Sequence, residues 1–290
     1  MRRWDLDKGV HQKITTVYST LTSSQKRLAD FILNCPYEAA LMSASKLAVH
    51  LKVSEATVVR FAQAVGFDGY PDLRENLQEQ LLREVRSSER VALMVENTPE
   101  RTGALYEIVS ETIYYLQLLI KNVSEEDIDE AVQRLDSKNR IFIYGEGAPG
   151  SLTFHADFWL SRLGYEVKRI TQTGRRLFDH IFLVSERDIA LVFAFRRVTM
   201  ETLAVLEVFA ESGGETILVT DMACSKIHPL ASQILLVQRG PMDAFRPLGP
   251  LAALVDALIL GLMRQKGLDA VEQLKRLDDL RERYGVLYDK

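Results

Sequence analysis

Residues 45–67 read SKLAVHLKVSEATVVRFAQAVGF, and this stretch predicts two short helices around a tight turn. The first helix covers Ser45 to Leu51, and Lys52 and Val53 form the turn. Ser54 is a favourable N-cap for the second helix, and Gly66 suits the left-handed position that closes it. The apolar residues of the second helix recur at helical spacing, namely Val58, Phe61, Ala62 and Val65.

Two helices that cross in this way are typical of a helix-turn-helix, whose second helix enters the major groove of DNA. Arg60 then faces outward and is able to read guanine, while Ser54 is placed to contact a phosphate. We expect the DNA-binding residues to be Ser43, Ser45, Lys46, Ser54, Glu55, Ala56, Thr57 and Arg60. Helical hairpins that bind no DNA share this pattern, so the pattern alone leaves both interpretations open.

The flanking sequence favours the DNA-binding interpretation. Thr22 and Gln25 form a capping box ahead of a further helix that ends at Pro36, which supplies the third helix of such a domain. Residues 1–86 hold twelve Lys and Arg against ten Asp and Glu, a balance of +2. The whole chain has a net charge of −4, so the residues after 86 carry a net charge of −6. The net positive charge of the proposed DNA-binding domain is therefore small.

The stretch LTSSQKRLADFIL, followed by SASKLAVHLKVSEATVVRFAQAVGFDGYPDLRENL, resembles the N-terminal domain of the MurR/RpiR family of bacterial transcriptional regulators. The resemblance runs through about seventy residues with few gaps. It implies a helix-turn-helix followed by a sugar-isomerase-like (SIS) domain. The remaining chain is expected to continue that pattern from Ile141 to about Gly267.

The chain is long enough for two domains. We expect a helix-turn-helix domain over 1–85, a linker and connecting helix over 86–123, an effector domain over 124–268 and a charged tail over 269–290. Short strands near 140–144, 165–170, 188–195, 215–220 and 233–238 alternate with helices. The fold class is therefore an all-α helix-turn-helix domain followed by an α/β three-layer SIS domain with a parallel, flavodoxin-like sheet.

The candidate effector site lies in two loops that follow the first and third strands. The first loop is GEGAPGSL, whose glycines allow close backbone approach and whose Ser151 begins a helix. SIS domains carry phosphate-binding serines in both loops, whereas the second loop here is AFRRVTME, with two arginines. We expect an anionic effector to be bound by Gly145, Gly147, Ser151, Arg196, Arg197, Thr199 and Glu201. Alternatively, the arginines form salt bridges at a dimer interface and no small ligand binds.

Catalysis is not expected. His155, His180 and His228 each stand alone in the sequence, and no Ser/His/Asp or metal-ligand arrangement is present. We therefore predict no catalytic residue, no metal and no cofactor. Two alternatives stay open, namely a sugar-phosphate isomerase with an accessory helical domain and a regulator that has lost its ligand.

The expected partners are a double-stranded DNA operator, a phosphosugar or sugar acid, and a second copy of the chain in a homodimer or tetramer. The strongly apolar helix near 103–121 suits an interdomain or dimer contact. No membrane partner is expected, because the longest apolar stretch, 251–263, is too short to span a bilayer. The N-terminal sequence has no apolar signal-peptide core, which predicts a cytoplasmic location. The predicted role is that of a ligand-responsive transcriptional repressor or activator.

Overall fold

The computed structural model describes residues 10–82, 103–195, 198–222, 225, 227–240 and 245–285. The chain divides into two compact units, the first formed mainly by residues 1–102 and the second by most of the residues from 103 onward. The first unit is all helical and the second is built around a parallel sheet, which confirms the predicted fold class.

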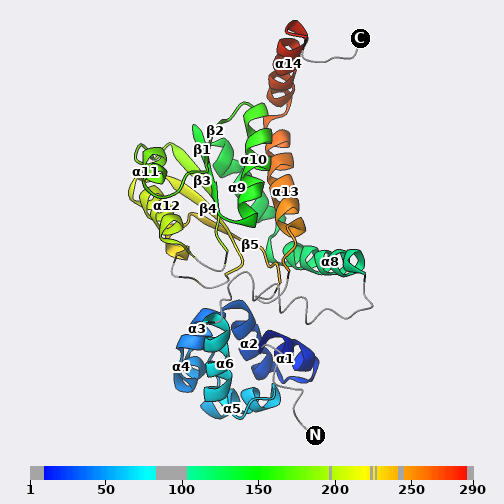
Figure 1. The fold of residues 1–290 in the computed structure, drawn as a ribbon, viewed down its shortest axis with the longest axis vertical. Coiled ribbons are helices and arrows are strands. Elements are labelled where there is room, and N and C mark those ends of the chain that lie inside the picture. Colours follow the sequence, from blue (N-terminus) through cyan, green and yellow to red (C-terminus); the bar gives the residue numbers. More distant parts are fainter. Residues whose placement is uncertain are drawn as a thin grey trace. The chain divides into compact units, whose positions relative to one another are not determined.

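Six helices make up the described part of the first unit (Figure 1). They are α1 (Val10–Val17), α2 (Ser23–Asn34), α3 (Pro36–Leu41), α4 (Ala44–His50), α5 (Glu55–Ala64) and α6 (Tyr70–Leu82), with a 3-10 turn at Tyr18–Thr20. The capping box at Thr22 and Gln25 is present at the start of α2. Pro36 both follows α2 and begins α3, a helix that the sequence pattern did not predict, because proline at the first helical position needs no amide donor.

Apolar residues from every helix of this unit form one core. Phe61, Leu47, Leu28 and Leu73 are fully buried in it, and they come from four different helices. Since α4 and α5 each present one apolar face, their opposite faces remain at the surface.

The second unit contains a five-stranded parallel sheet in the order β2-β1-β3-β4-β5. The strands are β1 (Arg140–Gly145), β2 (Glu166–Ile170), β3 (Asp188–Phe193), β4 (Glu215–Thr220) and β5 (Gln233–Leu236). All five were predicted, with ends that differ by at most two residues. Strand order reverses between β1 and β3, which is the flavodoxin-like arrangement.

Helices cover both faces of this sheet (Figure 1). On one face lie α9 (Glu125–Asp136), α10 (Ser151–Arg162) and α13 (Gly249–Lys266), and on the other lie α11 (Arg175–Ile181) and α12 (Met200–Glu211). The connecting helix α8 (Ala104–Asn122) packs against α13 and β5, and the charged C-terminal stretch forms α14 (Leu268–Arg283). β3 is buried along its whole length, as expected for a central strand between two helix layers.

Candidate functional site

The turn between α4 and α5 is fixed by backbone hydrogen bonds at the end of α4. The Val53 amide donates to the Ala48 carbonyl at 2.9 Å, and the Lys52 amide donates to the Val49 carbonyl at 3.2 Å. These two bonds form a Schellman motif, whose central residue adopts a left-handed conformation. Lys52 occupies that position with φ of 50°, where glycine is usual.

The second helix of the motif, α5, is closed at both ends as the sequence predicted. The Ser54 hydroxyl accepts a hydrogen bond from the Thr57 amide at 3.2 Å, which confirms the N-cap. At the other end Gly66 has φ of 93°, and the Phe67 amide donates to the Ala62 carbonyl at 3.0 Å. The Schellman motif at the end of α5 has glycine at the left-handed position, whereas the one at the end of α4 has Lys52 there.

The outward face of α5 is polar and open. Glu55, Ala56, Arg60 and Gln63 are exposed, while Val58 and Phe61 are completely buried on the opposite side. Six of the eight predicted DNA-binding residues are exposed: Ser45, Lys46, Ser54, Glu55, Ala56 and Arg60. Ser43 and Thr57 are half-buried, and the Ser43 hydroxyl caps α4 by accepting from the Lys46 amide at 3.3 Å.

Two distant side chains hold this motif in place, and the sequence pattern did not identify either. Arg27 of α2 donates to the Leu51 carbonyl at the end of α4. The Tyr70 hydroxyl donates to the carbonyls of Ala39, at 2.9 Å, and Met42, at 3.2 Å. Burial raises the pKa of Tyr70 to about 12. Tyr70 thus orients the chain between α3 and α4 as a neutral donor.

Replacing Lys52 by glycine is expected to raise the free energy of unfolding by about 0.5–1 kcal/mol. The left-handed conformation costs a residue with a Cβ about 1–2 kcal/mol, and the greater entropy of an unfolded glycine offsets part of that gain. Gly66→Ala is the matched opposite change and is expected to destabilise by about 1 kcal/mol. Urea denaturation checks both, and a loss of stability in Lys52→Gly contradicts the strain argument.

The candidate effector site lies at the carboxyl ends of β1 and β3. These strands are neighbours, with Gly145 paired to Phe193 at their ends. A Cβ on Gly150 would lie 2.5 Å from the Gly145 carbonyl oxygen, so the loop folds back tightly onto the strand. Gly147 has φ of 62°, which also requires glycine. The glycines therefore shape this loop, and the crevice lies where ligands bind in open parallel sheets.

A carboxylate that the sequence pattern did not predict as a site residue, that of Glu146, lies in this crevice. Glu146 accepts hydrogen bonds from the Thr199 hydroxyl at 2.9 Å and from the Tyr144 hydroxyl. Thr199 also caps α12 by accepting from the Thr202 amide at 3.0 Å. Burial and the hydrogen bond to Glu146 raise the pKa of the Tyr144 phenol, which keeps it a donor.

The structure also locates the other predicted effector residues. Glu201 accepts from the Gly174 amide at 2.7 Å, which links α12 to the loop after β2. Ser151 is exposed and donates to the Ala148 carbonyl at 2.7 Å. Arg196 and Arg197 lie outside the described residues. The described residues near this edge include the carboxylates of Glu146 and Glu201, several hydroxyls, and the buried Arg239, whose guanidinium lies 5.1 Å from the centroid of the Phe195 ring just after β3.

Family comparisons identify both units. Residues 8–84 match the helix-turn-helix domain of the rpiR family, and residues 134–264 match the SIS domain. The chain belongs to the RpiR family of transcriptional regulators. An RpiR-family protein combines a DNA-binding unit with a SIS unit, which is the arrangement described above.

Relatives of this RpiR-family protein are named as regulators. An HTH-type transcriptional regulator of Haemophilus influenzae is 28% identical over 237 residues, covering 79% of each chain. The HTH-type transcriptional regulator HexR of Pseudomonas aeruginosa is 25% identical over 283 residues, covering 94% of this chain and 95% of HexR. This similarity extends over both units.

Two solved structures share the fold. The sugar isomerase domain of an RpiR transcription factor from Sphaerobacter thermophilus has a TM-score of 0.58 at 20% identity, covering 61% of this chain and 99% of that one. The Vibrio vulnificus NanR protein complexed with ManNAc-6P has a TM-score of 0.58 at 18% identity, covering 97% of this chain and all of NanR. At these identities the likeness concerns the fold alone.

The three histidines of the second unit that were considered as bases lie on separate elements, His155 on α10, His180 on α11 and His228 on a 3-10 turn. The Nε2 atom of His155, on α10, contacts Asp256 of α13 at 2.6 Å. Among the described residues, no group of three His, Cys, Asp or Glu side chains is placed to hold a metal ion. No helix in the described part of the chain is long and apolar enough to span a membrane.

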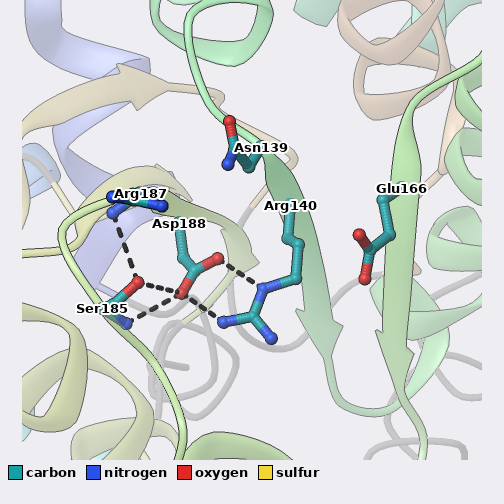
Figure 2. Close-up of a pocket in the computed structure, with 6 residues that line it drawn as sticks. All are labelled: Asn139, Arg140, Glu166, Ser185, Arg187 and Asp188. Atoms are coloured by element: carbon teal, nitrogen blue, oxygen red, sulfur yellow. Dashed lines mark hydrogen bonds and ion pairs between the residues drawn. The ribbon is translucent and has the colours of Figure 1, made fainter.

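A separate pocket of about 280 Å³ lies at the amino ends of the strands (Figure 2). Asp188 is fully buried and accepts hydrogen bonds from Arg140 at 2.7 Å and from the Ser185 amide at 2.8 Å. Although burial opposes ionisation, these bonds hold the pKa of Asp188 below its usual value. Because this carboxylate is fully paired within the protein, we interpret the cluster as a structural clasp between β1 and β3.

Proposed function

We propose that this regulator binds a DNA operator through α5 and is controlled by a small anionic carbohydrate-derived effector in the SIS unit. The observation that carries the effector proposal is the Glu146–Thr199 hydrogen bond in the crevice between β1 and β3. It places a carboxylate and a hydroxyl, the groups that bind sugar hydroxyls, where an open parallel sheet holds its ligands. In this proposal residues 1–85 bind DNA, residues 86–123 form the linker and connecting helix, residues 124–268 bind the effector, and residues 269–290 form the charged C-terminal tail.

Arg60 is proposed as the main base-reading residue. It is the exposed arginine on the outer face of α5, and guanidinium groups pair bidentately with guanine. Ser45, Lys46 and Ser54 are exposed near the same motif and are proposed to contact phosphates. Ser43, Glu55, Ala56 and Thr57 are proposed to complete the DNA-binding surface around them.

Arg60→Ala is expected to weaken specific operator binding by about 1–3 kcal/mol, which is roughly a 5- to 150-fold increase in Kd. Arg283→Ala removes the same charge from an exposed position on α14 and is the matched control. A DNA duplex that the wild-type protein selects from a random-sequence pool serves as the operator, and fluorescence anisotropy at fixed salt measures its binding to both variants. Equal affinity of Arg60→Ala and wild type contradicts the proposed role.

The effector is proposed to be a phosphosugar or sugar acid. Its hydroxyls would donate hydrogen bonds to the Glu146 carboxylate, while its acidic group would pair with the positively charged side chains of Arg196 and Arg197. NanR, which shares the fold, is described in complex with ManNAc-6P, and this supports a phosphorylated sugar as the first compound to test. The combination of acidic and basic groups favours a ligand that carries both hydroxyls and an anion.

A thermal-shift series with ManNAc-6P, other hexose 6-phosphates and sugar acids is expected to identify the effector. A ligand that binds only the folded state at 100 times its Kd stabilises by about 2.7 kcal/mol, which raises the melting temperature measurably. Unphosphorylated sugars are the controls for the acidic group. If no compound shifts the melting temperature, the protein is a regulator that does not bind this class of ligand. Turnover of a phosphosugar in a coupled enzyme assay would instead support the isomerase alternative.

A further inference from the structure

The turn between α4 and α5 holds a residue in a backbone conformation that does not suit it. Within the described ranges, Lys52 is the only residue other than glycine that has a positive φ, at 50°. A Cβ makes this left-handed conformation unfavourable, and glycine would adopt it freely. The corresponding position at the end of α5 is Gly66, with φ of 93°. Backbone strain that a protein keeps is typical of a functional position, so the lysine side chain is expected to offset the cost.

The Lys52 side chain contributes nothing visible to the fold. It is exposed, and it forms no hydrogen bond, ion pair or ring contact with any residue that the structure describes. Leu51 and Val53, on either side of it, both pack against the core of the first unit. The turn is therefore held firmly while the lysine projects into solvent, where a second molecule can reach it.

Lys52 also lies at the edge of the proposed DNA-binding surface. It precedes Ser54, the N-cap of α5, by two residues, a stretch of chain that spans at most about 7 Å. The amino end of a helix in the major groove approaches the base edges, and phosphates border the groove on both sides. A lysine has a long flexible stem and a compact charge, which suit it to contact such a phosphate.

The charge around the turn is positive and uncompensated. Arg27 of α2 donates to the Leu51 carbonyl, which brings a second cation next to Lys52. Glu55 is the nearest carboxylate along the chain, yet within the described ranges it forms no ion pair with either cation. Two neighbouring positive charges repel each other in the free protein, and a polyanion would relieve that repulsion. The turn is thus better suited to a phosphate backbone than to a neutral partner.

We propose that Lys52 contacts a phosphate of the operator backbone and that the strained turn is retained for this contact. The proposal rests on the proposed function, because it requires α5 to lie in the major groove. Phosphate contacts carry no sequence information, so Lys52 contributes equally to the binding of every DNA sequence. Stability and DNA binding therefore make opposite demands on position 52, since glycine would favour the fold and lysine favours the complex.

Lys52→Gln tests the contact, because it keeps the Cβ and much of the side-chain length and removes only the charge. Fluorescence anisotropy of the full chain measures binding to the selected operator duplex and to a scrambled duplex between about 50 and 300 mM salt. The slope of log K against log salt is expected to fall in magnitude by about 0.9, which corresponds to roughly 8-fold weaker binding at 0.1 M salt. Both duplexes should lose the same factor.

Three further variants complete the test. Lys52→Arg keeps the charge and is expected to bind both duplexes as the wild type does. Lys52→Gly is expected to lose the same affinity as Lys52→Gln while its melting temperature rises. Lys275→Gln removes the same charge from an exposed position on α14 and is the matched control, with an unchanged slope.

Several results would overturn the phosphate contact. Wild-type affinity and slope in Lys52→Gln do so, and a loss limited to the operator duplex does so as well, because it indicates base reading. A lowered melting temperature in Lys52→Gln shows that the side chain serves the fold instead. If the wild type itself binds neither duplex, the proposed function fails, whereas a wild type that binds beside an unaffected Lys52→Gln contradicts only the role of Lys52.

Discussion

Asp188→Ala is expected to lower the free energy of unfolding by about 3 kcal/mol. Removing one partner of a buried ion pair leaves the other desolvated, which typically costs about 3–5 kcal/mol, and the lower figure applies because Arg140 keeps some contact with water. The Ser185 amide and hydroxyl lose the same acceptor. The clasp joins β1 to β3, so its loss weakens the two strands that carry the effector loops (Figure 2). Urea denaturation measures the difference.

The destabilisation should depend on pH in a defined direction. The pKa of Asp188 is lowered in the folded protein, so its ionised form stabilises the fold above its unfolded pKa of about 4. That contribution is lost as the pH falls from about 4 through the lower pKa of the folded protein, so the difference between wild type and Asp188→Ala should shrink as the pH falls below about 4. Glu207→Gln is the control, because Glu207 is an exposed carboxylate on α12 and does not line this pocket. A difference that stays constant with pH argues against the ion pair as the cause.

Gly150→Ala is expected to abolish the effector response and to lower the free energy of unfolding by about 2 kcal/mol. The added Cβ would lie 2.5 Å from the Gly145 carbonyl oxygen and 3.1 Å from its carbon, and neither backbone atom moves without displacing the end of β1. Displacement of this loop also moves Glu146, which sits between the two glycines and binds Thr199. Operator binding without effector should be retained, because α5 belongs to the other unit.

Gly103→Ala is the matched control for this prediction. Its backbone has φ of −66°, and no atom lies within 4 Å of the added Cβ, so alanine fits there. Operator binding is measured with and without the effector found by thermal shift, and melting temperatures are recorded for both variants. An effector response in Gly150→Ala equal to that of the control would show that the tight loop is not required.

Helix caps and helix ends could be predicted from the sequence, because the residues that form them are neighbours along the chain. The Thr22–Gln25 capping box, the Ser54 cap and the Gly66 closure involve residues no more than five positions apart, so local spacing was enough to predict them. The alternation of short apolar runs with helices likewise predicted the parallel sheet, because strands covered on both faces are apolar throughout.

The hydrogen bonds between polar side chains that are distant in the sequence became known only from the tertiary structure. Glu146 and Thr199 are 53 residues apart, and Arg140 and Asp188 are 48 apart, yet each pair forms a hydrogen bond because β1 and β3 lie side by side. The tertiary structure also places Tyr70 on carbonyls 28 and 31 residues away. A one-dimensional pattern encodes caps and periodicity, whereas pairing across strands and helices depends on register and burial, which arise only when the chain has folded.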